Sequence, residues 1–336
     1  MFRDVCYVGL AGGLGQEGEI KTMRRTRFLV LIFFAFLAAA TLAAPARAGG
    51  ITLPTEAVQA MDEMYGGDPD AAINIMHGFE QTQAQNPLGY LLEAEARWWK
   101  IYCGACEIKW GMVDTWRRVK EPGDDAYLAL ADKTITLARE QLAKSDSAEM
   151  HLYAGIGWAL KARLYSLRGE NRSVAHAGVT ARAELLRASQ LDSQMADAWA
   201  GIGLYNYYVD TLSPIVKVLR FFMGIPGGNK KEGIRQMETA MNQGVLMTVE
   251  ARFNLAKNLR TYDEQYERAA ALMEPLVARY PHNPIFLLLL GNLNAELGRN
   301  AKASVYFRSA MDTSVPDPAC SARARGIADS FLRKLQ

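Results

Sequence analysis

The 336-residue chain has almost no net charge, with 38 Lys and Arg residues against 36 Asp and Glu. Nucleic-acid-binding proteins usually carry a basic excess, so nucleic acid is not an expected partner. The chain also lacks a Walker loop, an H-E-x-x-H motif and a G-x-S-x-G motif, and its four histidines lack the spacing of metal ligands. Acidic residues such as Glu93, Glu95, Asp124 and Asp125 are interpreted as solvent-facing or turn positions. We therefore predict a non-enzymatic protein without cofactor or metal.

Cysteine is scarce, with four residues in the chain. Cys103 and Cys106 form a C-x-x-C pair, which in an exported protein predicts a local disulfide, with two unlinked thiols as the alternative. A c-type haem would need His where the chain has Glu107, and a zinc site would need a second pair. A thiol-disulfide enzyme that uses Cys103 and Cys106 remains an alternative function, although its thioredoxin-like strand-and-helix setting is absent.

The chain has one long apolar run, at residues 28–44, and it lies close to the N-terminus. A basic segment, 23–27, precedes the run, and Ala46-Arg47-Ala48 follows it. This order is typical of a secretory signal peptide, here 23–48, and predicts a periplasmic or secreted protein after cleavage near Ala48. A retained membrane anchor is the alternative, because 17 apolar residues are at the lower limit for a span. Residues 1–22 are interpreted as a start-site extension, with translation beginning at Met23.

The rest of the chain, residues 49–336, has the period of α-helices. From Leu53 onward, apolar residues recur every three or four positions, and good helix formers dominate. Without its first 48 residues the chain has 32 basic and 33 acidic residues, so it has no charge bias toward anionic lipid. The sequence predicts an all-α domain.

Two segments near the C-terminus repeat with a period of 34 residues. The corresponding pairs are Phe253 and Leu287, Ala269 and Ala303, Met273 and Phe307, and Leu276 and Ala310. Small residues let two antiparallel helices approach, and large residues fill the groove against the next unit. The pattern resembles the tetratricopeptide repeat (TPR), a helix–turn–helix unit of this length that also occurs in exported bacterial proteins. Gly291 matches the family's small eighth position, whereas the earlier unit has Lys257 there.

The TPR resemblance covers nearly the whole of residues 49–336 and implies one solenoid of about six units. The units start near residues 53, 87, 150, 196, 250 and 284. The second, third and fourth units have expanded turns, with about 25, 12 and 18 extra residues. An amphipathic segment, 319–335, carries Ile327, Phe331 and Leu335 on one side. We expect this segment to form a capping helix, because terminal repeats need a cover for their apolar face.

A second resemblance concerns residues 199–255. The shared segments are Gly203-Leu204-Tyr205-Asn206, Leu212-Ser213-Pro214 and Gly227-Gly228-Asn229-Lys230-Lys231-Glu232-Gly233. They are similar to a eukaryotic TPR family, the inclusion-body clearance type found at mitochondrial and lipid surfaces. The similarity implies an interaction role and not a reaction.

The TPR resemblance also implies a partner-binding groove, because the first helix of each unit lines the concave surface in this family. Aromatic rings there supply contact area for a protein or peptide partner, and amides hold its backbone. The candidate residues are Trp98, Trp99, Trp158, Lys161, Tyr207, Tyr208, Asn254, Asn258, Tyr262 and Asn292. For each of them, packing between helices is the alternative. The predicted function is that of an exported scaffold for a partner that the sequence does not identify.

The expanded turn at residues 211–228 contains the signals of an extra helix. Ser213 can cap a helix, Pro214 suits its first turn and Gly224 suits its end. Its predicted apolar face comprises Ile215, Val218, Leu219, Phe222 and Met223. We interpret it as a helix that plugs the concave side. The alternative is a docking helix whose Phe221 side chain faces outward. In that case the protein would be a component of an envelope transport or assembly complex, and it would contact the membrane peripherally.

Overall fold

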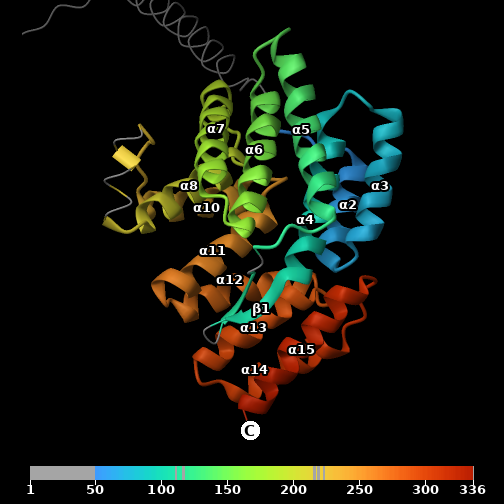
Figure 1. Cartoon of the computed structure of the whole chain (residues 1–336), viewed down its shortest axis with the longest axis vertical. Coiled ribbons are helices and arrows are strands. Elements are labelled where there is room, and N and C mark those ends of the chain that lie inside the picture. Colours follow the sequence, from blue (N-terminus) through green and yellow to red (C-terminus); the bar gives the residue numbers. More distant parts are fainter. Residues whose placement is uncertain are drawn as a thin grey trace, which may run out of the picture. The chain divides into compact units, whose positions relative to one another are not determined.

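The computed structural model describes residues 50–335, except 110, 111, 116, 117, 215, 216, 218, 219, 222 and 223 and the side chains of 108, 109 and 112–114. The predicted start-site extension, the signal peptide and the apolar face of the insert helix lie outside the described residues. Thirteen helices and two short strands form the described part (Figure 1). This arrangement confirms the predicted all-α class.

Twelve of the helices form six hairpins, and a final helix follows them. The first helices of the hairpins are α2 (Thr55–Gly66), α4 (Pro87–Ala105), α6 (Ala148–Arg168), α8 (Ala198–Thr211), α11 (Thr248–Asp263) and α13 (Pro284–Glu296). Their second helices are α3 (Pro69–Thr82), α5 (Gly123–Leu142), α7 (Asn171–Leu191), α10 (Lys230–Gln243), α12 (Tyr266–Arg279) and α14 (Asn300–Asp312). The capping helix is α15 (Pro318–Lys334). All six hairpins start within two residues of the predicted positions.

Local sequence signals explain where several helices begin. Asn86, Asn283 and Asp317 each precede a proline at the first helical position. Their side-chain oxygens accept hydrogen bonds of 2.9–3.2 Å from backbone N–H groups of the first turn. Such caps satisfy donors that the helix itself leaves unpaired, and proline loses no hydrogen bond at this position.

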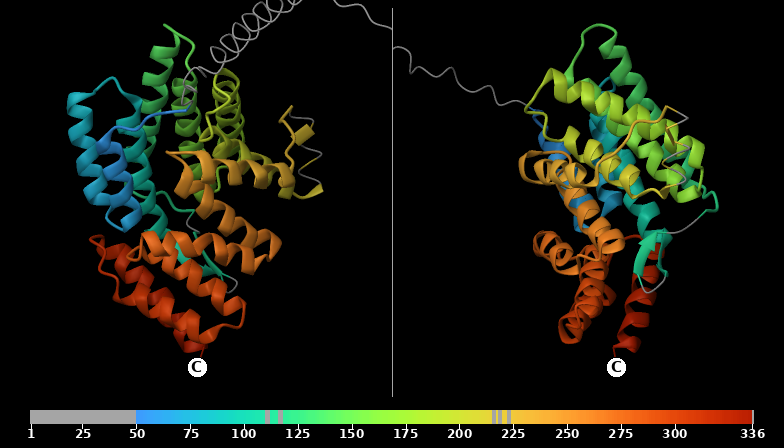
Figure 2. Two further views of the ribbon diagram at one scale, coloured as in Figure 1. Left: turned by 180° about the vertical axis from the view of Figure 1, so that it is seen from behind. Right: turned by 90° about the vertical axis from the view of Figure 1, so that its left-hand side faces the viewer.

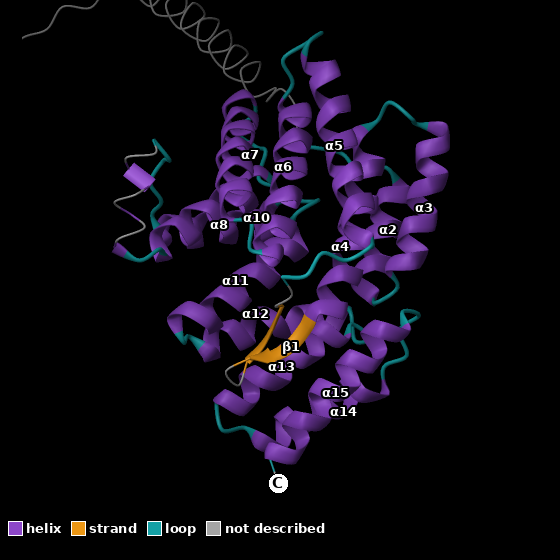
Figure 3. Ribbon diagram, viewed as in Figure 1, coloured by secondary structure: helices purple, strands orange, loops and turns teal. Residues whose placement is uncertain are grey.

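The extra residues of the expanded units take three different forms. In the second unit, β1 (Cys106–Lys109) and β2 (Met112–Thr115) form an antiparallel hairpin that the sequence analysis did not predict (Figure 3). In the third unit the extra residues lengthen both helices, α6 and α7. A turn of two residues, with Gly169 at a φ of 79°, joins these helices. The expectation of a stretched turn is wrong there, because helix formers continue through both segments. In the fourth unit the extra residues form an insert, at residues 212–229, between α8 and α10.

Glycines bring α8 and α10 into backbone contact. A Cβ atom on Gly233 would lie 2.5 Å from the carbonyl oxygen of Gly203, so a larger side chain would force the helices apart. Beside this crossing, the Asn206 amide donates a hydrogen bond of 2.8 Å to the Gln236 side chain. The small residue at the eighth repeat position therefore has the role that the spacing predicts.

The array of hairpins curls until its two ends meet, which places α4 inside. Trp99 of α4 packs against rings from three other hairpins: Tyr65 of α2 at 5.7 Å, Phe253 of α11 at 5.2 Å and Phe286 of α13 at 5.5 Å between centroids. All four rings are buried. The concave side of the array is therefore filled by the protein's own hydrophobic core.

Polar contacts join the first hairpin to the turn between α12 and α13. The Asn283 amide donates a hydrogen bond of 2.9 Å to the carbonyl oxygen of Tyr65. Asp62 accepts a hydrogen bond of 3.1 Å from the Tyr280 hydroxyl and forms an ion pair of 2.9 Å with Arg279. Figure 2 shows the first hairpin, in blue, beside the orange and red C-terminal helices. Residues more than 200 positions apart thus close the array.

A disulfide links α4 to the capping helix. It joins Cys103 to Cys320, with 5.1 Å between their Cα atoms. The predicted pairing of Cys103 with Cys106 is therefore wrong. The C-terminal end of α4 lies against the first turn of α15, and this contact places Cys320 beside Cys103. The spacing of cysteines in the sequence cannot show such a contact between distant helices. Cys106 begins β1 and is buried outside this disulfide.

Candidate partner-binding surface

The ten residues predicted to line the groove do not form one open surface. Five are less than 10% exposed: Trp98, Trp99, Tyr207, Asn258 and Asn292. For these residues the packing alternative holds, since they lie in the core. Five others are more accessible: Trp158, Lys161, Tyr208, Asn254 and Tyr262. The accessible residues lie on α6, α8 and α11.

Three charged groups in the closed interior tie α4, α6 and α11 together. Arg163 of α6 donates hydrogen bonds of 2.7 and 3.0 Å to Glu95 of α4, and it lies 3.3 Å from a carboxylate oxygen of Glu250 on α11. The indole N–H of Trp99 donates a further bond of 3.1 Å to Glu250. Glu95 and Glu250 are both 2% exposed, so the interpretation of Glu95 as solvent-facing is wrong.

The interior cluster contains two acids for one cation, and this imbalance affects its protonation. Burial raises the pKa of Glu95 to about 7; Arg163 opposes the rise and the carboxylate of Glu250 adds to it. Burial would lower the pKa of Arg163, but Glu95 and Glu250 more than offset that effect and hold it above its usual range. Arg163 is therefore charged at all physiological pH values, and the cluster connects helices inside the core.

Trp158 and Lys161 belong to the packing of α6 against its neighbours. The Trp158 ring lies 4.9 Å from the Lys161 ammonium nitrogen and 5.5 Å from the Arg139 guanidinium carbon. The ring of His176 meets it edge-on at 5.6 Å, and Lys161 forms an ion pair of 2.5 Å with Asp132. These contacts reach α5 and α7, so the cluster is separate from the accessible residues of α8 and α11.

Tyr208 and Tyr262 form an accessible aromatic pair, which we call the tyrosine edge. Their rings pack edge to face, 6.0 Å apart at an angle of 82°, and Tyr262 is 51% exposed. The Tyr208 hydroxyl donates a hydrogen bond of 2.9 Å to the side-chain oxygen of Asn258. Asn254, Asn258 and Tyr262 lie four residues apart on α11, so they follow one face of that helix from the core to the surface.

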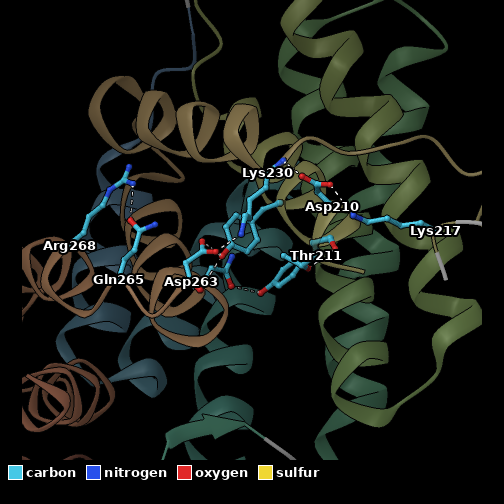
Figure 4. Close-up of polar contacts among 10 residues, drawn as sticks. Asp210, Thr211, Lys217, Lys230, Asp263, Gln265 and Arg268 are labelled. Atoms are coloured by element: carbon cyan, nitrogen blue, oxygen red, sulfur yellow. Dashed lines mark hydrogen bonds and ion pairs between the residues drawn. The ribbon is translucent and has the colours of Figure 1, made fainter. Parts of the chain in front are cut away.

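A polar network beneath the tyrosine edge fixes its position (Figure 4). The Tyr207 hydroxyl donates to Asp263 at 2.7 Å, and Lys230 forms an ion pair with the same carboxylate. The backbone N–H of Lys230 donates to Asp210 at 2.8 Å, and Lys217 lies 3.1 Å from Asp210. The ends of α8 and α11, the insert and the start of α10 are thus held together by groups that are distant in sequence.

Three further features concern metal binding, a cavity and the membrane. Among the residues that the structure describes, no cluster of three or more His, Cys, Asp or Glu side chains is placed to hold a metal ion. A cavity of about 290 Å³ lies between α5 and α6, and its lining includes the ion pair of Asp124 and Arg168. Both side chains of this pair are buried. The interpretation of Asp124 as a solvent-facing or turn position is therefore wrong. None of the described helices is both long and apolar enough to cross a membrane.

The six hairpins define an all-α helical-repeat fold, and the last two units, whose sequences repeat with a period of 34 residues, resemble the tetratricopeptide repeat. No model of a known protein family matches the chain, and no curated protein matches it. Among solved structures, the chain is similar to MamA, with 16% identity over 58% of this chain and 95% of that one and a TM-score of 0.38. It is also similar to the C-terminal part of a TPR repeat-containing protein from Cytophaga hutchinsonii, with 16% identity over 83% of this chain and 87% of that one and a TM-score of 0.39. For the human IFIT1 dimer with PPP-AAAA the identity is 13%, the coverage 80% of this chain and 59% of that one, and the TM-score 0.40.

Proposed function

We propose that the protein is an exported, non-enzymatic scaffold that binds a protein or peptide partner at the tyrosine edge. The packed pair of partly buried Tyr208 and exposed Tyr262 is the observation that carries this proposal. Tyrosine rings supply a large contact area at a low cost in side-chain entropy, and here packing and hydrogen bonds hold them in place before binding. Repeat proteins bind partners over extended surfaces. Because the concave side is core, the partner binds outside it.

The amide of Asn254 near the tyrosine edge is already engaged and that of Asn258 is buried, which shapes the proposed contact. Asn254 donates to the backbone oxygen of Glu250 at 2.9 Å and to its carboxylate at 3.0 Å. Asn258 is buried and accepts the bond from Tyr208. We therefore expect the rings, and not the amides, to supply the binding energy.

Two observations support the export part of the proposal. The basic, apolar and small-residue segments at 23–48 have the order of a signal peptide. The disulfide between Cys103 and Cys320 is of a kind that persists in oxidising compartments. The same disulfide removes the basis of the thiol-disulfide enzyme, because Cys103 does not pair with Cys106.

A capture experiment tests the tyrosine edge. The chain from Gly49, which forms one compact unit, is cross-linked to partners from its own envelope fraction. We expect the double variant Tyr208→Ala, Tyr262→Ala to capture at least about tenfold less partner, because loss of a tyrosine that is a binding hot spot costs about 2 kcal/mol or more. The matched control is Val305→Ala, which truncates another exposed apolar side chain, on α14, and is expected to capture normally.

Each outcome of the capture experiment has a definite meaning, provided that circular dichroism shows unchanged helix content. Equal capture by wild type and double variant would refute binding at the tyrosine edge. No capture by any form would refute the scaffold itself.

A second candidate is a component of an envelope transport or assembly complex that docks through the insert. It is favoured by Phe221, which is 76% exposed. The same capture, performed with Phe221→Ala, separates the candidates. Loss of membrane-protein partners in this variant alone would favour docking through the insert, and unchanged capture would exclude it.

A further inference from the structure

Two arginines lie beside Tyr205 of α8 without acidic partners among the described residues. The guanidinium carbon of Arg182, on α7, lies 5.4 Å from the centroid of the Tyr205 ring. Arg220, in the insert, donates a hydrogen bond of 2.9 Å to the carbonyl oxygen of Ile225. The Tyr205 hydroxyl donates to the next carbonyl, that of Pro226, at 2.9 Å. The short segment 225–226 therefore holds Arg220 beside the Tyr205 hydroxyl, while Arg182 lies against the ring of the same tyrosine.

Most N–H donors of these arginines are unused. The Nε atoms of Arg182 and Arg220 are buried and have no hydrogen-bond partner in the described part of the chain. A guanidinium has five N–H donors, and Arg220 uses one of them for Ile225. Arg182 is partly exposed, so a ligand from solvent can approach its side chain.

In the part of the chain that the structure describes, no carboxylate forms an ion pair with Arg182 or Arg220. Burial raises the pKa of the Tyr205 phenol, and Arg182 and Arg220, the charged groups that act on it, both oppose this rise. The insert from Leu212 to Asn229 contains no Asp or Glu in its sequence. The nearest acid on α8, Asp210, is held by Lys217 and by the backbone N–H of Lys230.

We infer that Arg182 and Arg220 form a binding site for a phosphate-type oxyanion. Two uncompensated cations that act on one phenol repel each other, and a doubly charged anion relieves this repulsion. The guanidinium fork matches the oxygen spacing of phosphate in a bidentate manner. A simple carboxylate carries a single charge and neutralises only one of the two groups. Inorganic phosphate, a phosphorylated small molecule and a phospholipid headgroup share the required chemistry.

Calorimetric titration of the chain from Gly49 with inorganic phosphate, at low and constant ionic strength, tests the site. We expect Arg182→Gln and Arg220→Gln each to weaken phosphate binding at least tenfold. The matched control, Arg172→Gln, removes the same charge from an exposed position on the same helix and should leave binding unchanged. Acetate should bind wild type at least tenfold more weakly than phosphate. No phosphate binding, equal binding of acetate, or an equal loss in the control would overturn the inference.

Conservative variants keep the inference testable if a glutamine variant fails to fold. Arg182→Lys and Arg220→Lys preserve the charge but remove the bidentate fork. With helix content unchanged by circular dichroism, we expect a loss of phosphate affinity that is smaller than in the glutamine variants. Affinity equal to that of wild type in both lysine variants would overturn the guanidinium site.

Sedimentation with phosphatidylcholine vesicles, with and without phosphatidic acid, distinguishes the sources of the phosphate group. Binding to the phosphatidic acid vesicles that needs both arginines would support the site and assign it to a lipid headgroup. Binding of inorganic phosphate without vesicle binding would support a soluble phosphate ligand. Vesicle binding that persists in both glutamine variants, without phosphate binding, would contradict the inference.

Discussion

Breaking the Cys103–Cys320 disulfide is expected to cause the largest loss of stability of any change considered for this protein. The disulfide closes a loop of 217 residues, and loop-closure entropy predicts a loss of about 5 kcal/mol in the free energy of unfolding. The disulfide is also the covalent link between the capping helix α15 and α4. Denaturant unfolding of the variant Cys103→Ser, Cys320→Ser, compared with wild type, measures the loss.

The disulfide prediction has internal controls. Cys106→Ser should change the stability much less, because it leaves the link between α4 and α15 intact. A reductant should lower the unfolding midpoint of wild type and leave that of the double serine variant unchanged. Peptide mapping that finds Cys103 bonded to Cys106 would contradict the disulfide between Cys103 and Cys320. An unfolding midpoint of wild type that does not change with reductant would contradict it as well.

Removing the cation from the buried cluster should have the second largest effect. Arg163→Met is expected to destabilise the protein by about 3–5 kcal/mol at neutral pH, since it leaves Glu95 and Glu250 buried without a cation. The triple variant Glu95→Gln, Arg163→Met, Glu250→Gln removes all three charges and should lie much closer to wild type. A triple variant as unstable as the single variant would show that packing of Arg163, and not charge, is decisive.

The same cluster predicts a pH dependence whose sign follows from the raised pKa of Glu95. The folded-state pKa is about 7, against an ordinary value of 4.5, so between these pH values the folded protein binds more protons than the unfolded chain. The contribution of Glu95 to stability therefore falls as the pH rises through this window. The difference in unfolding free energy between wild type and Glu95→Gln should move in favour of the variant from about pH 5 to pH 7.5. A difference that is constant over this range would contradict the raised pKa of Glu95. Burial also raises the pKa of Glu80 to about 7, but Glu80 is present in both proteins, so its contribution cancels in the difference.

Local signals were sufficient to predict the hairpins of the fold. Helical periodicity and the 34-residue spacing both act over short stretches of the chain. The unit boundaries therefore agree with the structure. The hairpin of β1 and β2 was missed because its strands are only four residues long, too short for an alternating pattern to be distinctive.

The closure of the array depends on contacts that local patterns do not encode. Trp99 meets Glu250 across 151 residues, and Cys103 meets Cys320 across 217. Aromatic residues were therefore placed in an open groove, whereas half of the predicted set packs the core. One signal of closure was present: α13 has an unbroken apolar run from Ile285 to Leu290, and a helix that is apolar all round is buried on all sides.

Hydrogen–deuterium exchange of the chain from Gly49 tests most directly the claim that the concave side of the repeat is its core. We predict that the backbone amides in the middle of α4 and α13 exchange only through global unfolding, with a protection equal to the free energy of unfolding from denaturant titration. The second helices of the hairpins, such as α3 and α12, should exchange faster. Exchange in α4 and α13 that is as fast as in α3 and α12 would show an open groove and contradict the account.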